Sequence, residues 1–222
     1  MSRAEELYQK LLESEIIGQK GTINFNLGSI SVKIQDVNVV GNILQEWLAS
    51  FMSGNNFMFA EKPNSQEFPD YLLSSNASTK EDLLEVKAFK GSPNFDVANF
   101  SAYARSLRDH AYRLDAKYLI FKYSANDGEI IIENIWLKNV WEICSPSNRS
   151  PVKIQWKQGD PVNIRPATWY SDKTAYQTFS TRKDFVHALS QVIGMARIET
   201  SIQRGWLAQV EQNYSLHTNN QI

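Results

Sequence analysis

The chain contains 222 residues, 42% of them apolar and 12% aromatic, which is enough for one folded core or for a core with a small subdomain. Its one cysteine, Cys144, excludes an intrachain disulfide and a zinc cluster built on cysteines, and no run of about 18 apolar residues is present to span a membrane. The net charge of −1 argues against a protein that coats nucleic acid without sequence preference, because lysine and arginine usually carry phosphate binding.

The first third of the chain predicts helices and one hairpin before any candidate site. Apolar side chains recur at helical spacing twice, and polar and apolar side chains alternate between the two helices. The expected elements are a helix over 4–13, a hairpin over 22–34 that turns at Leu27-Gly28-Ser29, a helix capped by Asp36 or Asn38 and continuing to about Met52, and a short strand over 57–59.

A second hairpin is predicted around a pair of acids. Two apolar runs of strand type, residues 71–73 and 83–86, flank the turn-rich segment 74–80. Asp70 comes directly before the first run, after a proline, and Glu85 lies within the second. Since paired strands of a hairpin lie side by side, we expect the two carboxylates to be close together.

These residue types suit phosphodiester cleavage with a divalent metal ion. Carboxylate oxygens are the ligands that Mg²⁺ prefers, and one or two of them are enough because the ion keeps several waters. Lys87 lies two residues after Glu85, so both side chains point to the same face of the strand while Val86 points to the other. An ammonium group placed there can orient the attacking water, stabilise developing charge, or release its proton if burial lowers its pKa.

A structural interpretation of the same residues stands beside the catalytic one. Asp70 can simply open a turn after proline, with Glu85 and Lys87 as an exposed pair on a strand. A similar pattern, Asp115-Ala116-Lys117, has no Pro-Asp before it at short range, and we expect it to begin the strand over 118–123 instead.

The sequence Pro69-Asp70, fourteen residues and then Glu85-Val86-Lys87 resembles the PD-(D/E)XK nuclease superfamily, and within it the small type II restriction endonucleases. The order of elements is similar over residues 36–125. The resemblance implies that Asp70 and Glu85 bind Mg²⁺, that the Val86 carbonyl is a further ligand, and that Lys87 is the catalytic lysine. The upstream helix often supplies another acid in this superfamily, which is Glu46 here; its alternative is an ordinary solvated glutamate. The whole chain also looks similar to restriction enzymes that cut GGNNCC.

The remaining elements complete an α/β fold. We expect a restriction-endonuclease-like core over about 36–140, with a central mixed sheet flanked by helices, and one nuclease domain spanning 1–222. The later elements are a helix over 96–112, strands over 118–123 and 129–137 joined by the turn Ala125-Asn126-Asp127-Gly128, and a hairpin or ribbon over about 145–170. A helix over about 181–206 follows, capped by Ser180 or Thr181 with Gly194 as a candidate break, and then a frayed polar tail from Asn213.

Candidate DNA-binding side chains gather toward the carboxyl end, where residues 151–222 hold 8 basic and 5 acidic residues. Arginine and lysine suit guanine in the major groove, and asparagine and glutamine suit adenine. The loop and ribbon offer Asn148, Arg149, Lys153, Gln155, Lys157 and Arg165, while Lys90, Ser92 and Asn94 follow the catalytic strand and are expected to contact phosphates. Alternating polarity also exposes such side chains on any surface hairpin.

The sequence therefore favours a Mg²⁺-dependent type II restriction endonuclease that cuts double-stranded DNA at a short palindrome. Two-fold symmetry of the site predicts a homodimer, for which the final helix is one candidate interface. No glycine-rich phosphate loop is present, so no nucleotide cofactor is expected. The expected setting is the cytoplasm of a prokaryotic cell. The alternatives are a repair or structure-specific nuclease of the same fold, and a catalytically silent module that binds DNA or a partner.

Overall fold

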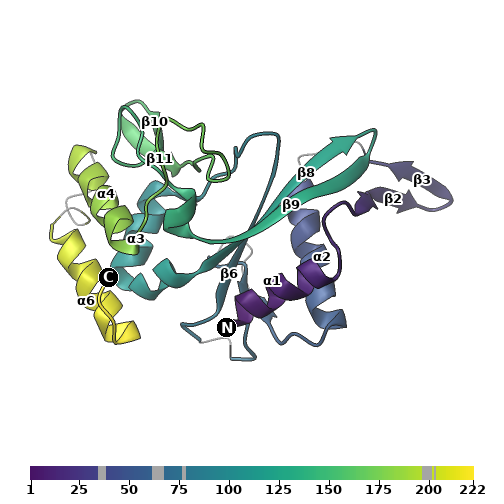
Figure 1. The fold of residues 1–222 in the computed structure, drawn as a ribbon, viewed down its shortest axis with the longest axis horizontal. Coiled ribbons are helices and arrows are strands. Elements are labelled where there is room, and N and C mark those ends of the chain that lie inside the picture. Colours follow the sequence, from purple (N-terminus) through teal and green to yellow (C-terminus); the bar gives the residue numbers. More distant parts are fainter. Residues whose placement is uncertain (35–38, 62–67, 77–78, 197–201, 203) are drawn as a thin grey trace. The chain divides into compact units, whose positions relative to one another are not determined.

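The computed structural model describes residues 1–34, 39–61, 68–76, 79–196, 202 and 204–222 (Figure 1). The predicted helix caps Asp36 and Asn38 lie outside these residues. The chain forms two compact units: a first unit of Met1–Ser92 with Lys117–Leu137, and a second unit of Pro93–Ala116 with Lys138–Ile222. Among the described residues, no helix combines the length and the apolar character needed to cross a bilayer.

The first unit is built on a six-stranded mixed sheet. Strands β6 and β8 are parallel, with Glu85 opposite Tyr118, and β5 pairs antiparallel with β6, with Tyr71 opposite Leu84. The turn at Asp127-Gly128, where both residues have positive φ, joins β8 to β9 as predicted. In spatial order the strands are β1 (Lys20–Thr22), β9 (Glu129–Asn139), β8 (Lys117–Asn126), β6 (Leu83–Lys90), β5 (Tyr71–Leu72) and β4 (Ala60–Glu61).

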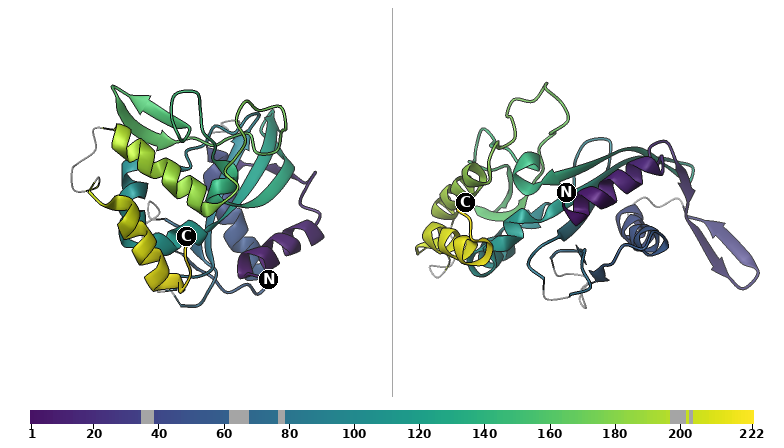
Figure 2. Two further views of the ribbon diagram at one scale, coloured as in Figure 1. Left: turned by 60° about the vertical axis from the view of Figure 1, so that its left-hand side comes forward. Right: turned by 60° about the horizontal axis from the view of Figure 1, so that its bottom comes forward.

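Two helices, α1 (Arg3–Glu13) and α2 (Val40–Gly54), cover one face of this sheet (Figures 1 and 2). Ser2 caps α1 in a capping box with Glu5. The apolar side chains of both helices recur every three or four residues, so each helix presents one stripe to the sheet. The core that results contains Leu7 and Leu11 from α1, Leu44, Leu48 and Met52 from α2, and Leu84, Val86, Leu119, Phe121, Ile132 and Ile135 from the sheet.

The predicted hairpin over 22–34 is confirmed as a separate two-stranded sheet of β2 (Asn24–Leu27) and β3 (Ile30–Lys33). Gly28 has φ +59°, the left-handed conformation that a tight turn needs. Every residue of both strands is exposed. The predicted strand over 57–59 is wrong: the strand there begins at Ala60, because Ala60 and Glu61 are the residues that pair with β5.

The second unit combines helices with a three-stranded sheet ordered β10, β11, β7. The predicted ribbon is confirmed as an antiparallel pair, and β7 adds a third strand to it. The elements are β7 (Ala98–Asn99), α3 (Phe100–Asp109), the 3-10 helices η2 (Ala111–Asp115) and η3 (Val140–Ile143), β10 (Ile154–Lys157), β11 (Asp160–Ile164), α4 (Arg182–Met195) and α6 (Trp206–Thr218).

The helix predicted over 96–112 is shorter than expected at its amino end. Residues Ala98 and Asn99 pair with β11, so the helix starts only at Phe100. The Asn99 side chain accepts a hydrogen bond from the Ala102 N–H and caps α3. Strand pairing thus overrides the helical pattern at this end.

The polar tail predicted to fray from Asn213 is instead part of α6. Tyr214 is 2% exposed, and its hydroxyl donates to the Asp115 carboxylate at 2.8 Å. The Asn213 side chain donates to the Arg108 carbonyl, and the Trp206 indole donates to the Ala104 carbonyl at 2.7 Å. The prediction was wrong because the residues after Asn213 are mostly polar, and the partners that hold α6 lie about 100 residues earlier in the chain.

Arg182 at the start of α4 anchors this part of the second unit. Its guanidinium lies 4.5 Å from the Tyr214 ring centroid and 5.1 Å from that of Trp141, and it pairs with Asp115. We expect Arg182→Ala to destabilise the protein by about 1–3 kcal/mol, because cation–π contacts and a partly buried ion pair are lost together. Urea unfolding measures this, with the exposed neighbour Lys183→Ala as control. Equal midpoints for the two variants would contradict the prediction.

Candidate active site

Strand register brings the two predicted acids together. Asp70 directly precedes β5, and Tyr71 lies opposite Leu84, so Asp70 faces the stretch of β6 that begins at Glu85. The Asp70 Oδ2 atom accepts a hydrogen bond from the Val86 N–H at 2.7 Å. The Asp70 main-chain N–H in turn hydrogen bonds to the Glu85 carboxylate. The acids therefore lie side by side on neighbouring segments, as their spacing predicted.

Lys87 joins this pair through the alternation of the strand. Its Nζ atom lies 2.8 Å from Glu85 Oε1, and the Lys87 and Glu85 side chains are 21% and 10% exposed. Val86 points to the opposite face and is buried in the core against α1 and α2. The strand thus presents its charged residues on one face and its apolar residue on the other.

Burial governs the charge of the site. Desolvation raises the pKa of Glu85 to about 7; the Lys87 ammonium opposes this change, and the Asp70 charge adds to it. Desolvation also raises the pKa of Asp70, against hydrogen bonds from Val86 and Gln45 and the charge of Lys87. Glu85 Oε2 is buried and has no hydrogen-bond partner within the described part of the chain. A buried carboxylate oxygen without a partner is costly unless it binds a proton or a cation.

The α2 residue that reaches the site is Gln45, which the sequence reasoning missed. The Gln45 side chain hydrogen bonds to Asp70, and its main-chain carbonyl accepts from the Tyr71 hydroxyl at 2.8 Å. Glu46 is exposed, and the described residues contain no group of three or more acidic, histidine or cysteine side chains that could hold a metal. Helical spacing could have identified Gln45. Residues three or four apart share a helix face, so Gln45 lies on the side of the buried Leu48, whereas Glu46, two residues before Leu48, points away from it.

The residues present fit a hard divalent cation. Asp70 and Glu85 supply two carboxylates, and Glu85 contributes the buried oxygen without a partner. In a strand the N–H and C=O of one residue point to the same side. Since the Val86 N–H points at Asp70, its carbonyl faces the same side and can act as a third oxygen ligand. Magnesium needs no more from a protein, because waters complete its coordination.

Three of the predicted DNA-binding side chains are already engaged within the second unit. The Lys153 Nζ atom donates to the Pro166 carbonyl at 2.9 Å, and burial lowers its pKa. Arg165 pairs with Asp96 and also donates to the Asn94 carbonyl. The Gln155 side chain accepts from Asn163 at 3.2 Å. These contacts fix the base of the β10–β11 ribbon.

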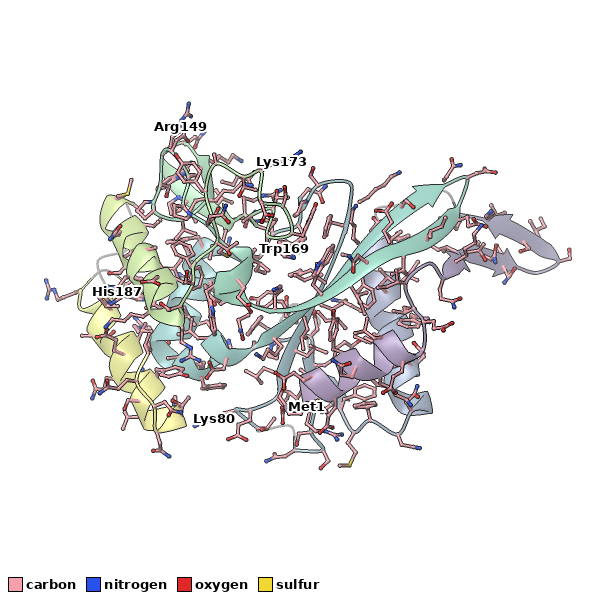
Figure 3. All side chains as sticks on the ribbon, viewed as in Figure 1. Met1, Lys80, Arg149, Trp169, Lys173 and His187 are labelled. Carbon is pink, nitrogen blue, oxygen red and sulfur yellow. The ribbon has the colours of Figure 1, made fainter. Side chains whose placement is uncertain are left out.

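Other predicted DNA-binding residues are exposed. In the second unit these are Asn94, Asn148, Arg149 and Lys157, and Figure 3 shows Arg149 at the periphery of its loop. In the first unit, Ser92 is exposed and Lys90 donates to the Ala125 carbonyl at 3.0 Å. Arg149 and Lys157 therefore present cationic groups on the loop and ribbon where the sequence placed them.

The fold is that of a restriction endonuclease. The solved structure of the NlaIV restriction endonuclease matches with a TM-score of 0.91 and 35% sequence identity, covering 100% of this chain and 92% of that one. The expected α/β class, with a central mixed sheet flanked by helices, is thereby confirmed.

Sequence comparison gives the family. The model of the NgoBV restriction endonuclease family matches residues 1–222. The type II restriction enzyme NlaIV of Neisseria lactamica is 35% identical over 224 residues, 99% of this chain and 92% of that protein. The type II restriction enzyme NgoBV of Neisseria gonorrhoeae is 35% identical over 147 residues, 63% of this chain and 81% of that protein. This chain belongs to the NgoBV restriction endonuclease family and is a type II site-specific deoxyribonuclease.

Proposed function

We propose that this enzyme hydrolyses both strands of a short DNA palindrome as a Mg²⁺-dependent homodimer, with Asp70, Glu85 and Lys87 as catalytic residues. The observation that carries the proposal is the buried Glu85 carboxylate, paired with Lys87 at 2.8 Å and linked to Asp70 through the main chain. A structural ion pair would not need a second acid beside it, nor leave a buried oxygen without a partner.

Each residue has a distinct role in this chemistry. Bound Mg²⁺ supplies positive charge that neutralises the scissile phosphate and activates water. Asp70 and Glu85 hold the ion through carboxylate oxygens, and the Val86 carbonyl is a further ligand. Lys87 orients the attacking water and stabilises the charge that develops on the phosphate. Gln45 holds the Asp70 carboxylate in place from α2.

The proposed site is the interrupted palindrome GGNNCC. Guanine presents two acceptors in the major groove that arginine and lysine can meet, and Arg149 and Lys157 are exposed cations on a loop and ribbon of a shape that fits that groove. The enzyme acts in the cytoplasm of a prokaryotic cell. Residues 1–222 form one nuclease domain, in agreement with a family model that spans both compact units.

Digestion of phage DNA tests the proposal. With Mg²⁺ the enzyme should produce discrete fragments whose sequenced ends share one palindrome, whereas Ca²⁺ should permit DNA binding without cleavage. A smear or branch-specific nicking would instead indicate a repair or structure-specific nuclease. Cut positions that map elsewhere than GGNNCC in the phage sequence would reject that site and leave the restriction activity standing.

We expect Arg149→Ala and Lys157→Ala to weaken DNA binding. Each phosphate contact that is lost should lower the slope of log affinity against log salt by about 1, whereas loss of a guanine contact should cost about 1–3 kcal/mol and relax specificity. Binding measured in Ca²⁺ at several salt concentrations separates the two outcomes. Lys183→Ala, on the exposed side of α4, is the matched control. Unchanged affinity in both variants would remove the ribbon from the DNA interface.

A further inference from the structure

The β2–β3 hairpin carries an apolar face that nothing in the described chain covers. Cross-strand register pairs Phe25 with Val32 and Leu27 with Ile30, so these four side chains share one face. Their exposed fractions are 54%, 49%, 71% and 67%, respectively. The opposite face carries Asn24, Asn26, Ser31 and Lys33. Folded monomers seldom expose such a contiguous apolar face unless it is an interaction surface.

The apolar face continues into a hollow at the foot of the hairpin. A cavity of about 180 Å³ lies there, and its lining includes Ile23, Ile43, Trp47 and Ile130. The Ile34 N–H donates to the Ile23 carbonyl at 2.8 Å and extends the ladder by one pair, so alternation places Ile23 on the same side as Phe25 and Leu27 and joins the hairpin face to the cavity. The hairpin extends beyond the ends of β8 and β9 within the first unit (Figures 1 and 2). The first unit thus holds both a projecting apolar element and an apolar hollow.

We propose that this surface, the hairpin face with the adjacent cavity, is where a second copy of the chain docks. The inference rests on the proposed two-fold enzyme, because an isologous interface must be self-complementary and this surface offers a projection and a hollow together. A stable interface buries about 800 Å² on each partner. We therefore expect the contact to include the rim of the cavity as well as the hairpin face.

Charge favours a second copy over DNA as the occupant. Lys33 is the one ionisable residue within 24–33, and it lies on the face opposite to Phe25 and Leu27. Lys20, which lines the cavity, pairs with Glu129 at 2.9 Å, so the described part of this surface offers a phosphate backbone no unpaired cation. The helix expected over 181–206, the interface predicted from sequence, ends at Met195 as α4, and its apolar residues Phe185, Val186, Leu189 and Val192 are buried. The four apolar side chains of the hairpin are exposed.

Two matched double variants test the interface. Leu27→Glu with Ile30→Glu places charges on the apolar face, while Asn26→Glu with Ser31→Glu places the same charges, as a cross-strand pair, on the opposite face. Sedimentation velocity should find the wild type and the Asn26/Ser31 variant at twice the chain mass of 25.4 kDa. The Leu27/Ile30 variant should sediment as a monomer, with at least a tenfold higher dissociation constant. All four positions are exposed, so circular dichroism should report an unchanged fold.

A cysteine variant gives a second measurement that does not depend on disrupting the surface. Cys144 is buried, so Leu27→Cys adds a single exposed thiol, and its rate of reaction with a maleimide should fall at least tenfold when the protein concentration is raised until the chain is dimeric. Asn26→Cys, on the opposite face, should react at the same rate at both concentrations. Equal protection of the two thiols, or a Leu27/Ile30 variant that stays dimeric, would overturn the inference, as would a monomeric wild type at micromolar concentration in the presence of DNA.

Digestion of DNA by the wild type distinguishes a failure of the proposed interface from a failure of the proposed nuclease function. A dimer that depends on Leu27 and Ile30 but does not cut DNA would refute the nuclease proposal alone. An active dimer indifferent to these residues would refute the interface alone. A Leu27/Ile30 variant that stays dimeric and loses DNA affinity would assign the hairpin to DNA instead.

Discussion

Glu85→Gln and Lys87→Ala should each lower the rate of DNA cleavage by at least about 1000-fold at saturating Mg²⁺. Glutamine removes the negative charge that neutralises a divalent ion, and alanine removes the ammonium that acts on the attacking water, effects that typically reach this size. The measurement is single-turnover cleavage of a labelled duplex, which reports the chemical step without product release. Ca²⁺-dependent DNA binding should persist in Lys87→Ala and weaken in Glu85→Gln, since Glu85 is a proposed metal ligand and Lys87 is not.

The first unit supplies a matched control pair. Lys122 and Glu133 also form an ion pair at 2.8 Å, on the neighbouring strands β8 and β9, with side chains 28% and 37% exposed. Glu133→Gln and Lys122→Ala should cleave within about threefold of the wild type, because a surface ion pair contributes at most about 1 kcal/mol to stability. Retained activity in both Glu85→Gln and Lys87→Ala would remove the catalytic assignment and favour a structural role for these residues.

Glu85→Gln should also stabilise the metal-free protein, by an amount that grows with pH. The folded protein holds the Glu85 proton up to a pKa of about 7, whereas the unfolded chain releases it near the ordinary value of 4.5. Between these values the folded state binds more protons, so wild-type stability falls as the pH rises. Glutamine cannot ionise, and the stability difference between variant and wild type should therefore increase by about 3 kcal/mol from pH 4.5 to 8.

Urea unfolding in EDTA across this pH range measures the difference. The Glu133→Gln variant is the control: its hydrogen bond with Lys122 lowers the pKa of Glu133, so its stability difference should change only below about pH 4.5 and stay nearly constant from pH 4.5 to 8. Adding Ca²⁺ at pH 8 should raise the stability of the wild type by mass action and leave Glu85→Gln almost unchanged. A stability difference that does not vary with pH would mean that burial does not raise the pKa of Glu85.

Local patterns predicted the elements that depend on neighbours in sequence. The β2–β3 and β8–β9 hairpins formed where turn residues separate alternating strands, and Thr181 caps α4 as expected. The spacing from Asp70 to Glu85 was informative because the two residues lie on consecutive segments of one β-hairpin. Consecutive strands joined by a turn pair with each other, so the sequence alone predicts that these residues are neighbours. Asp115-Ala116-Lys117 leads into strand β8 as predicted, and Asp115 pairs with Arg182.

Long-range contacts decided what the sequence patterns could not. Lys153 and Arg165 look like free cations on an alternating strand, yet backbone carbonyls and Asp96 engage them. The polar segment after Asn213 reads as a tail, but its few anchors find partners in the η2 and α3 region. Sequence gives the side chains available on a face and not the neighbours that will meet them.

By itself the sequence predicted the class of enzyme that the family comparison confirms, because two carboxylates and a lysine at strand spacing suit cleavage of a phosphodiester. Only the tertiary structure decided which side chains contact those groups and how far burial shifts their pKa values. Packing α2 against the sheet selects Gln45 over Glu46 as the neighbour of Asp70, and enclosing Glu85 raises its pKa. Desolvation and hydrogen-bond geometry depend on every element that surrounds a group, and these elements come from separate parts of the chain.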